Sequence, residues 1–293
     1  MTVFYRRMPR FGYFRARSLE EALGALDETT PVGHQVYAGG TDLLPKLKAR
    51  SIRAPLRVID LKGIADLDYI RWDPDTGLRI GALATTRDVA ATRLVSEKYP
   101  ALAQGARDMG SNQLQNRGTI VGNICNASTS ADSAPALLVH DAKVICVGTS
   151  GERAIDIAEF FADAGKTVLR AGELVKEIRI PPPQPQERGT YIKLTARGKM
   201  DLGLVGVAVS GIVEGGVVRK LRMGLGSAAP IPVRASEAEA ALMGREFCAE
   251  AIDECAAVAA RHARTRTSHR ASAEYRRMMI DVLARRALAQ IAR

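Results

Sequence analysis

The stretch YAGGTD, residues 37–42, lies between the short apolar run QV and the basic segment LLPKLKAR. Glycine tolerates a positive φ and lets a ligand approach the backbone, and successive N–H groups in such a turn form an anion-binding nest. A helix that begins after Asp42 adds partial positive charge at the same place, with Asp42 as its N-cap. Alone, the glycine pair equally fits a simple turn, because it lacks the GxGxxG spacing of dinucleotide folds and the GK[ST] ending of a P-loop.

A second stretch, NRGTIVGNICNASTSADSAP at residues 116–135, supplies what the first lacks. Its small and polar residues expose many backbone N–H groups along one path. A diphosphate with ribose hydroxyls needs such donors, together with a carboxylate such as Asp132 that accepts from a hydroxyl or a ring N–H. We therefore expect residues 111–133 to form a functional loop packed against the protein, although a solvated irregular loop has the same composition.

The composition is that of a soluble globular protein of about two domains, with 293 residues, 46% of them hydrophobic and 25% charged. No apolar run approaches the ~20 residues of a membrane span, and the N-terminal segment shows no secretory cleavage pattern, so we expect a cytoplasmic protein. The four cysteines form no CxxC pair and have no histidine at zinc-like spacing. This favours buried thiols over metal ligands or disulfides.

The formal charge of +10 is concentrated at the two ends. Residues 1–17 contain five arginines and no acid, and residues 261–293 contain nine arginines against Glu274 and Asp281. Basic ends on a near-neutral body suit a nucleic acid, a membrane surface or a partner subunit. A nucleic-acid surface would show interleaved aromatics or a reading motif, which this sequence lacks. We expect docking surfaces for another subunit.

Helix and strand signals alternate irregularly, which predicts an α+β protein. SLEEALGAL begins with a capping box made by Ser18 and Glu21 and continues with apolar residues at helical spacing. The turn DPDTG between DYIRW and LRIGALA predicts a β-hairpin. Beyond the proline-rich connector at residues 181–186, three strands and then helices are expected. The last helix has a predicted apolar face made of Tyr275, Met278, Met279, Val282 and Leu283.

Together, the two stretches resemble the FAD-binding subunit of the molybdenum-containing hydroxylases, the family of xanthine dehydrogenase and of the medium subunit of carbon monoxide dehydrogenase. The family signature AGG[TH][DS]L is similar to Ala38, Gly39, Gly40, Thr41, Asp42 and Leu43. A second signature, RNRGTIGGN followed by ASPAAD, resembles QNRGTIVGNICNASTSAD. The later segments DLGLVGVAVSG and YRRMMIDVLARRAL look like the family's C-terminal domain, so the resemblance covers nearly the whole chain.

The resemblance implies a vanillyl-alcohol-oxidase-like FAD-binding fold of the PCMH type. Its FAD-binding domain would span residues 1–180, with α+β subdomains at about 1–55 and 56–180. A C-terminal domain at residues 187–293 would hold a three-stranded antiparallel sheet and a helix bundle. By the same resemblance, the FAD site consists of Ala38, Gly39, Gly40, Thr41, Asp42, Leu43, Thr119, Gly122, Asn123, Ser128, Asp132, Leu174, Val175 and Lys193.

Two positions depart from the family pattern. Val121 replaces the first glycine of the GGN motif, so either its backbone is ordinary or the turn is adjusted. Gln115 stands where the family often has an arginine. The chain also lacks the cysteine-rich insertion that carries an extra iron–sulphur cluster in the 4-hydroxybenzoyl-CoA reductase type.

The function that the resemblance implies is electron transfer within a multi-subunit oxidoreductase. A large subunit would hold the molybdenum cofactor, and a small subunit would pass electrons through iron–sulphur clusters to the FAD of this chain. The acceptor would be NAD, a quinone or oxygen, and the complex a dimer of heterotrimers. The chain itself shows no nucleophile–base constellation and no metal site, so no catalytic residue is expected. Alternatives are a stand-alone FAD-dependent oxidase or dehydrogenase and, from another class, a basic nucleic-acid-binding protein.

Overall fold

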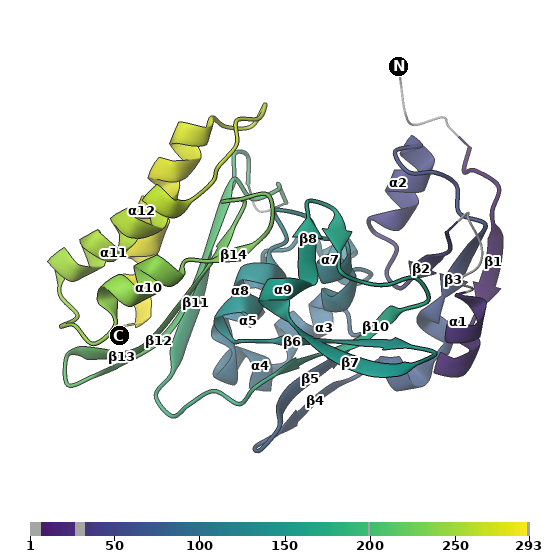
Figure 1. The fold of residues 1–293 in the computed structure, drawn as a ribbon, viewed down its shortest axis with the longest axis horizontal. Helices are drawn as coiled ribbons and strands as arrows, with labels where there is room; N and C mark the ends of the chain where they lie inside the picture. The colour runs from purple at the N-terminus through teal and green to yellow at the C-terminus, as the bar shows by residue number, and fades with distance from the viewer. Residues whose placement is uncertain (1–6, 27–32, 199, 292–293) are drawn as a thin grey trace.

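A small parallel sheet opens the chain in the computed structural model, which describes residues 7–26, 33–198 and 200–291. Its strand order is β1-β3-β2, and it lies at the right of Figure 1. The elements of this first unit are β1 (Gly12–Arg15), α1 (Leu19–Ala25), β2 (Gln35–Tyr37), α2 (Leu43–Ala49) and β3 (Arg57–Asp60). Because β3 is the central strand, the unit extends to at least Asp60, beyond the expected boundary near residue 55.

The capping signal at the start of α1 is confirmed with one difference. The Ser18 hydroxyl accepts a hydrogen bond from the backbone N–H of Glu21. The Glu21 carboxylate accepts from the N–H of Arg17 at 2.9 Å, one residue before the position that a capping box predicts. The helix therefore begins where the sequence indicated, with its N-terminal donors satisfied.

A five-stranded antiparallel sheet forms the middle of the molecule, in the order β4-β5-β10-β6-β7. The predicted hairpin is present as β4 and β5, which turn around residues 74–76. The elements of this unit are η2 (Leu61–Gly63), η3 (Ala65–Leu67), β4 (Ile70–Asp73), β5 (Gly77–Gly81), α3 (Thr86–Ala91), α4 (Arg93–Lys98), α5 (Pro100–Arg107), α6 (Asn112–Gln115), α7 (Ile120–Cys125), α8 (Ser133–Val139), β6 (Lys143–Gly148), β7 (Gly151–Asp156), α9 (Ile157–Phe160), β8 (Phe161–Asp163), β9 (Lys166–Thr167) and β10 (Leu174–Ile180).

The expectation of a loop at residues 111–133 is wrong for much of its length. The segment contains α6 and α7 and ends where α8 begins. The hydroxyls of Ser111 and Thr119 accept from Leu114 N and Gly122 N and thus cap these short helices. Small polar residues favour caps as well as loops, so composition alone did not separate the two.

An antiparallel sheet with helices on its outer face forms the last unit, at the left of Figure 1. Its order is β11-β12-β13-β14, so the expected three-stranded sheet has a short fourth strand, which pairs with Gly224 and Leu225. The inner face packs on α5 and α8 of the middle unit. The elements are β11 (Arg188–Leu194), β12 (Val205–Glu214), β13 (Val217–Gly226), β14 (Val233–Arg234), α10 (Ser236–Leu242), α11 (Ala249–His262) and α12 (Ala273–Ile291).

The core-facing side of α12 differs from the predicted apolar face. Tyr275 and Met278 are exposed, whereas Arg276 is buried among the C-terminal residues. The face that packs in the core consists of Arg276, Ile280, Leu283, Ala284, Ala287, Leu288 and Ile291. Alanines fill this face because α12 packs closely on α11, and alanine at helical spacing is a weaker apolar signal than methionine or tyrosine. None of the helices in the described parts of the chain has the length and apolar character of a membrane span.

Candidate cofactor-binding cavity

A cavity of about 870 Å³ lies where the three units meet. Its size falls within the range of about 300–1,000 Å³ that small-molecule and cofactor sites occupy. It is lined by the β2–α2 turn, by α7, by the start of β10 and by β11. All the residues singled out in the sequence line it: Ala38, Gly39, Gly40, Thr41, Asp42, Leu43, Thr119, Gly122, Asn123, Ser128, Asp132, Leu174, Val175 and Lys193.

The two glycine-containing stretches are in direct contact. A Cβ added at Gly39 would lie 2.0 Å from the carbonyl oxygen of Arg117 and 2.9 Å from the Cα of Gly118. Gly40 has a φ of +75°, and a Cβ there would lie 2.0 Å from the ring of Tyr37. Both glycines are therefore required by the packing of the protein itself. Their absence of side chains also leaves the backbone open to the cavity.

Backbone donors at the β2–α2 turn are available to a ligand. Within residues 7–26, 33–198 and 200–291, no acceptor is found for the N–H groups of Gly40, Thr41, Asp42 and Leu43. Asp42 precedes α2 as expected, but its side chain makes no capping hydrogen bond. The turn thus presents successive unsatisfied donors, which is the arrangement that binds phosphate oxygens.

A lysine on α2 crosses the cavity and was not assigned to the site from the sequence. Lys46 was expected on the helix surface or at a partner contact, but it lines the cavity and its Nζ donates to the side-chain oxygen of Asn126. Lys62 pins the turn from the other side: its Nζ donates to Ala38 O at 3.3 Å and to Asp60 Oδ1 at 2.7 Å. The spacing of LLPKLKAR did not show which of its cations faces inward.

The opposite end of the cavity is built from buried charged side chains. Lys193 Nζ lies 2.8 Å from Asp132 Oδ2, and their side chains are only 4% and 8% exposed. The Tyr191 hydroxyl donates to Asp132 Oδ1 at 2.8 Å, and Lys193 also donates to the carbonyl of Asp108 at 2.9 Å. Since Asp132 precedes α8 and Lys193 lies on β11, this ion pair joins the middle and C-terminal units.

Burial dominates the protonation equilibria at this end. It raises the pKa of Asp132, and the charge and hydrogen bond of Lys193 act against that rise. Burial, followed by the negative charge of Asp132, raises the pKa of Tyr191 well above its ordinary value. The tyrosine hydroxyl therefore stays protonated and donates to the carboxylate.

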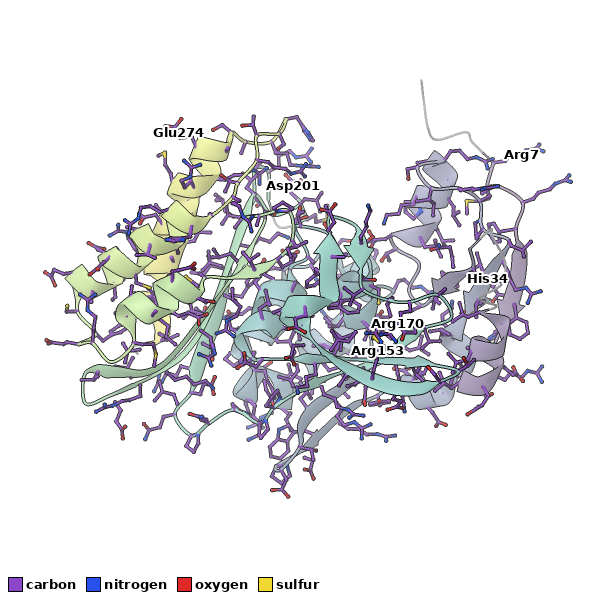
Figure 2. All side chains as sticks on the ribbon, in the orientation of Figure 1. Arg7, His34, Arg153, Arg170, Asp201 and Glu274 are labelled. Atoms are coloured by element: carbon purple, nitrogen blue, oxygen red, sulfur yellow. The ribbon has the colours of Figure 1, made fainter. Side chains whose placement is uncertain are left out.

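One wall of the cavity was missed in the sequence, namely the segment between β8 and β10. Residues 165, 167 and 169–173 line the cavity opposite α7. Glu173 fixes the segment because both its oxygens accept from Arg153 at 2.7 Å and one accepts from Arg170 N at 2.8 Å. Figure 2 shows Arg153 and Arg170 close together in the middle of the molecule. Two glycines with positive φ, Gly165 and Gly172, are the sequence signal that could have marked this wall.

Both departures from the family pattern have a structural explanation. Val121 lies in the first turn of α7, where its side chain is buried and its φ is not positive. No glycine is required there. Gln115 is also buried, and its Nε2 donates to the carbonyls of Arg107 and Met109 at 2.9 and 3.2 Å. It fastens α6 to the end of α5 and so supports the segment that precedes α7.

The cavity fits a dinucleotide cofactor better than a site for covalent or metal chemistry. Its shape and its free backbone donors suit a diphosphate, and its buried Lys193–Asp132 pair suits a polar ring edge. The thiol at the cavity wall is unreactive, because burial raises the pKa of Cys125 to about 12. In the described parts of the chain, no group of three or more His, Cys, Asp and Glu side chains is placed to hold a metal ion.

Comparison with known proteins agrees with this reading of the cavity. Residues 9–183 match the family described as "FAD binding domain in molybdopterin dehydrogenase", and residues 190–291 match "CO dehydrogenase flavoprotein C-terminal domain". The chain is 31% identical to the glyceraldehyde dehydrogenase medium chain of Sulfolobus acidocaldarius, over 97% of this chain and 99% of that one.

Two further relatives have FAD-binding or molybdenum-cofactor proteins in their names. The xanthine dehydrogenase FAD-binding subunit of Escherichia coli O157:H7 is 30% identical, with coverage of 95% of this chain and 94% of that one. Among solved structures, carbon monoxide dehydrogenase from Hydrogenophaga pseudoflava, in a form that lacks the Mo-pyranopterin moiety of its cofactor, superposes with a TM-score of 0.92 at 32% identity. That match covers 97% of each chain.

Proposed function

Because this chain belongs to the FAD-binding subunits of the molybdopterin dehydrogenase family, we propose that it holds FAD in the 870 Å³ cavity and passes electrons through it. The electrons would come from iron–sulphur clusters in a small partner subunit and leave to an external acceptor. Substrate would be oxidised at a molybdenum cofactor in a large partner subunit. FAD supplies the redox chemistry, since it takes up and releases electrons one at a time.

The observation that carries this proposal is that a single cavity unites both glycine-containing stretches with the buried Lys193–Asp132 pair. We assign the diphosphate to the free N–H groups of residues 40–43 and to the facing residues Thr119, Gly122 and Asn123. Ser128 supplies a hydroxyl for the ribityl or ribose oxygens. Leu174 and Val175, both buried on β10, form an apolar wall for a ring system. Lys193 and Asp132 face the polar edge of the flavin.

The side chains of this cavity bind and orient; they do not form or break bonds in a substrate. Its walls contain no nucleophile held beside a base, which is why we place substrate oxidation in a different polypeptide. The division of labour within the chain follows the same logic. We propose that residues 1–180 form the FAD-binding domain and that residues 187–293 form a C-terminal domain, which contributes Lys193 to the cavity.

The test is the absorption spectrum of the purified chain combined with identification of the proteins that co-purify with it. We expect flavin absorbance at about one FAD per chain, iron and molybdenum in the co-purified complex, and a mass that fits a dimer of heterotrimers. A chain that takes up no flavin even after reconstitution would refute the proposal. A chain that holds FAD and reduces it with a small-molecule substrate, without partner subunits, would favour a stand-alone oxidase or dehydrogenase instead.

A further inference from the structure

A second, smaller pocket of about 380 Å³ opens beside the main cavity. The two share Lys46, Asn126, Ser128 and Gly165, so a ligand in one is adjacent to a ligand in the other. The remaining lining comes from both domains: Thr129, Ala164, Ala229, Pro230, Arg264 and Arg266. This volume suits a diphosphate with an attached sugar and is small for an entire dinucleotide.

The pocket is cationic and has no acidic residue in its lining. Lys46 approaches from α2, and Arg264 and Arg266 approach from the connection between α11 and α12. Both arginines are exposed, and within the described residues neither side chain makes a hydrogen bond or an ion pair. Guanidinium groups with free donors on two sides of a pocket are the arrangement that binds phosphate in a bidentate manner.

More positive charge lies behind this surface. Arg276 is buried, and it donates to Leu204 O and to Ser268 Oγ, while its Nε has no hydrogen-bond partner in the described chain. Burial, and then the nearby charges of Arg266 and Arg270, lower the pKa of Arg276. Several like charges thus lie within electrostatic reach of one another without a carboxylate of their own. Such repulsion destabilises the free protein, and a bound anion relieves it.

We propose that this pocket binds the diphosphate of a dinucleotide electron acceptor whose reactive ring enters the adjoining FAD cavity. The inference rests on the proposed function, because it requires a flavin in that cavity. Among the acceptor classes open to this chain, a pyridine dinucleotide carries negative charge, whereas a quinone and oxygen do not. A cationic pocket beside the flavin therefore distinguishes between them. The geometry assigns Arg264, Arg266 and Lys46 to the phosphates, apart from the backbone donors assigned to the FAD diphosphate.

The experiment is calorimetric titration of the FAD-loaded protein with ADP-ribose and, separately, with inorganic pyrophosphate. The test variant is Arg264→Gln/Arg266→Gln. The matched control is Arg261→Gln/Arg277→Gln, which removes two exposed arginines of the same segment that do not line either cavity. We expect both probes to bind the parent protein, with about a tenfold or greater loss of affinity in the test variant and little change in the control. The rate of flavin reduction by NADH at low NADH concentration should fall in parallel.

Four other outcomes would overturn the inference. Weak binding of pyrophosphate that is the same in all three proteins would indicate an adventitious ion only. Binding of pyrophosphate without ADP-ribose would indicate a site for free phosphate. Loss of FAD from the test variant but not from the control would show that the pocket belongs to the FAD site, and loss of co-purifying subunits would show that it is a protein interface. A parent protein without flavin would instead refute the proposed function, so the two failures are distinguishable.

Discussion

At residues 38–43 and 119–123 the cavity is lined by backbone, whereas at Asp132 and Lys193 it is lined by buried charges from two units of the fold. The first end, called here the glycine end, depends on close approach of two chain segments and on free N–H groups. The second, called the charged end, depends on an ion pair that is nearly excluded from water. A diphosphate needs positioned donors that do not titrate, while a redox-active ring responds to the charge beside it. The two ends should therefore fail in different ways.

The largest effect is expected from Lys193→Met, which leaves the Asp132 carboxylate buried without its cation. Breaking a buried ion pair at one partner costs about 3–4 kcal/mol in the free energy of unfolding. The loss should depend on pH, because the raised pKa of Asp132 rises further when Lys193 is gone. An acid with a raised pKa in the folded state reduces stability as the pH rises above its unfolded value of about 3.9. Urea denaturation should show a small deficit near pH 4 and the full deficit at pH 8.

The matched control for this prediction is the double variant Lys193→Met/Asp132→Asn. It removes both charges, so the unpaired carboxylate is gone and most of the lost stability should return. A deficit in the single variant that is the same at pH 4 and pH 8 would contradict the view that charge, and not packing of the lysine side chain, stabilises this end.

A smaller loss, and a different kind of failure, is expected at the glycine end from Gly39→Ala. The new Cβ would meet the Arg117 carbonyl at 2.0 Å, so the two segments must move apart. Overpacking against backbone costs about 2 kcal/mol, and FAD content should fall because the donors of both segments lose their spacing. The loss should not change with pH. Gly24→Ala is the control, since a Cβ there meets no atom within 4 Å and alanine favours the helix by about 0.5–1 kcal/mol.

Sequence reasoning found the glycine end more completely than the rest of the site. Gly39 and Gly40 are constrained by backbone packing and by a φ of +75°, so their requirement is visible as residue type. The position of Lys46 depends on how α2 is rotated, and the wall at residues 169–173 depends on the ion pair between Arg153 and Glu173, which are twenty positions apart. Such features arise from tertiary contacts between ordinary charged residues, which carry no local signal.

The fold shows the same division. The α+β class, the capping box and the β4–β5 hairpin follow from local patterns, and the structure confirms them. The helices inside residues 111–133 and the alanine face of α12 did not follow, because small residues serve loops, caps and close helix packing equally well. What decided those cases was the neighbouring element, which a single sequence does not show.

The charged end should also set the reduction potential of the flavin. A cation near the ring stabilises the more negative reduced form, so Lys193→Ala should lower the midpoint potential. Removal of the neighbouring negative charge in Asp132→Asn should raise it. A shift of about 30 mV in each direction corresponds to a tenfold change for a two-electron couple. Spectroelectrochemical titration measures both. Arg93→Gln, whose side chain is 91% exposed and outside the cavity, should not shift the potential; an unchanged potential in both site variants would remove Lys193 from the flavin edge.

The smallest effect separates the two segments of the glycine end from each other. The Thr119 hydroxyl accepts from Gly122 N at 2.9 Å and so caps α7, whereas the Asp42 side chain caps nothing. Thr119→Ala should therefore cost about 1 kcal/mol, and Asp42→Ala less than about 0.5 kcal/mol, in urea denaturation. Thr119→Ser keeps the hydroxyl and should restore most of the loss. Equal costs at the two positions would mean that Asp42 stabilises its turn through its carboxylate, in which case the donors of residues 40–43 would face a fixed negative charge and would be a poor cradle for a diphosphate.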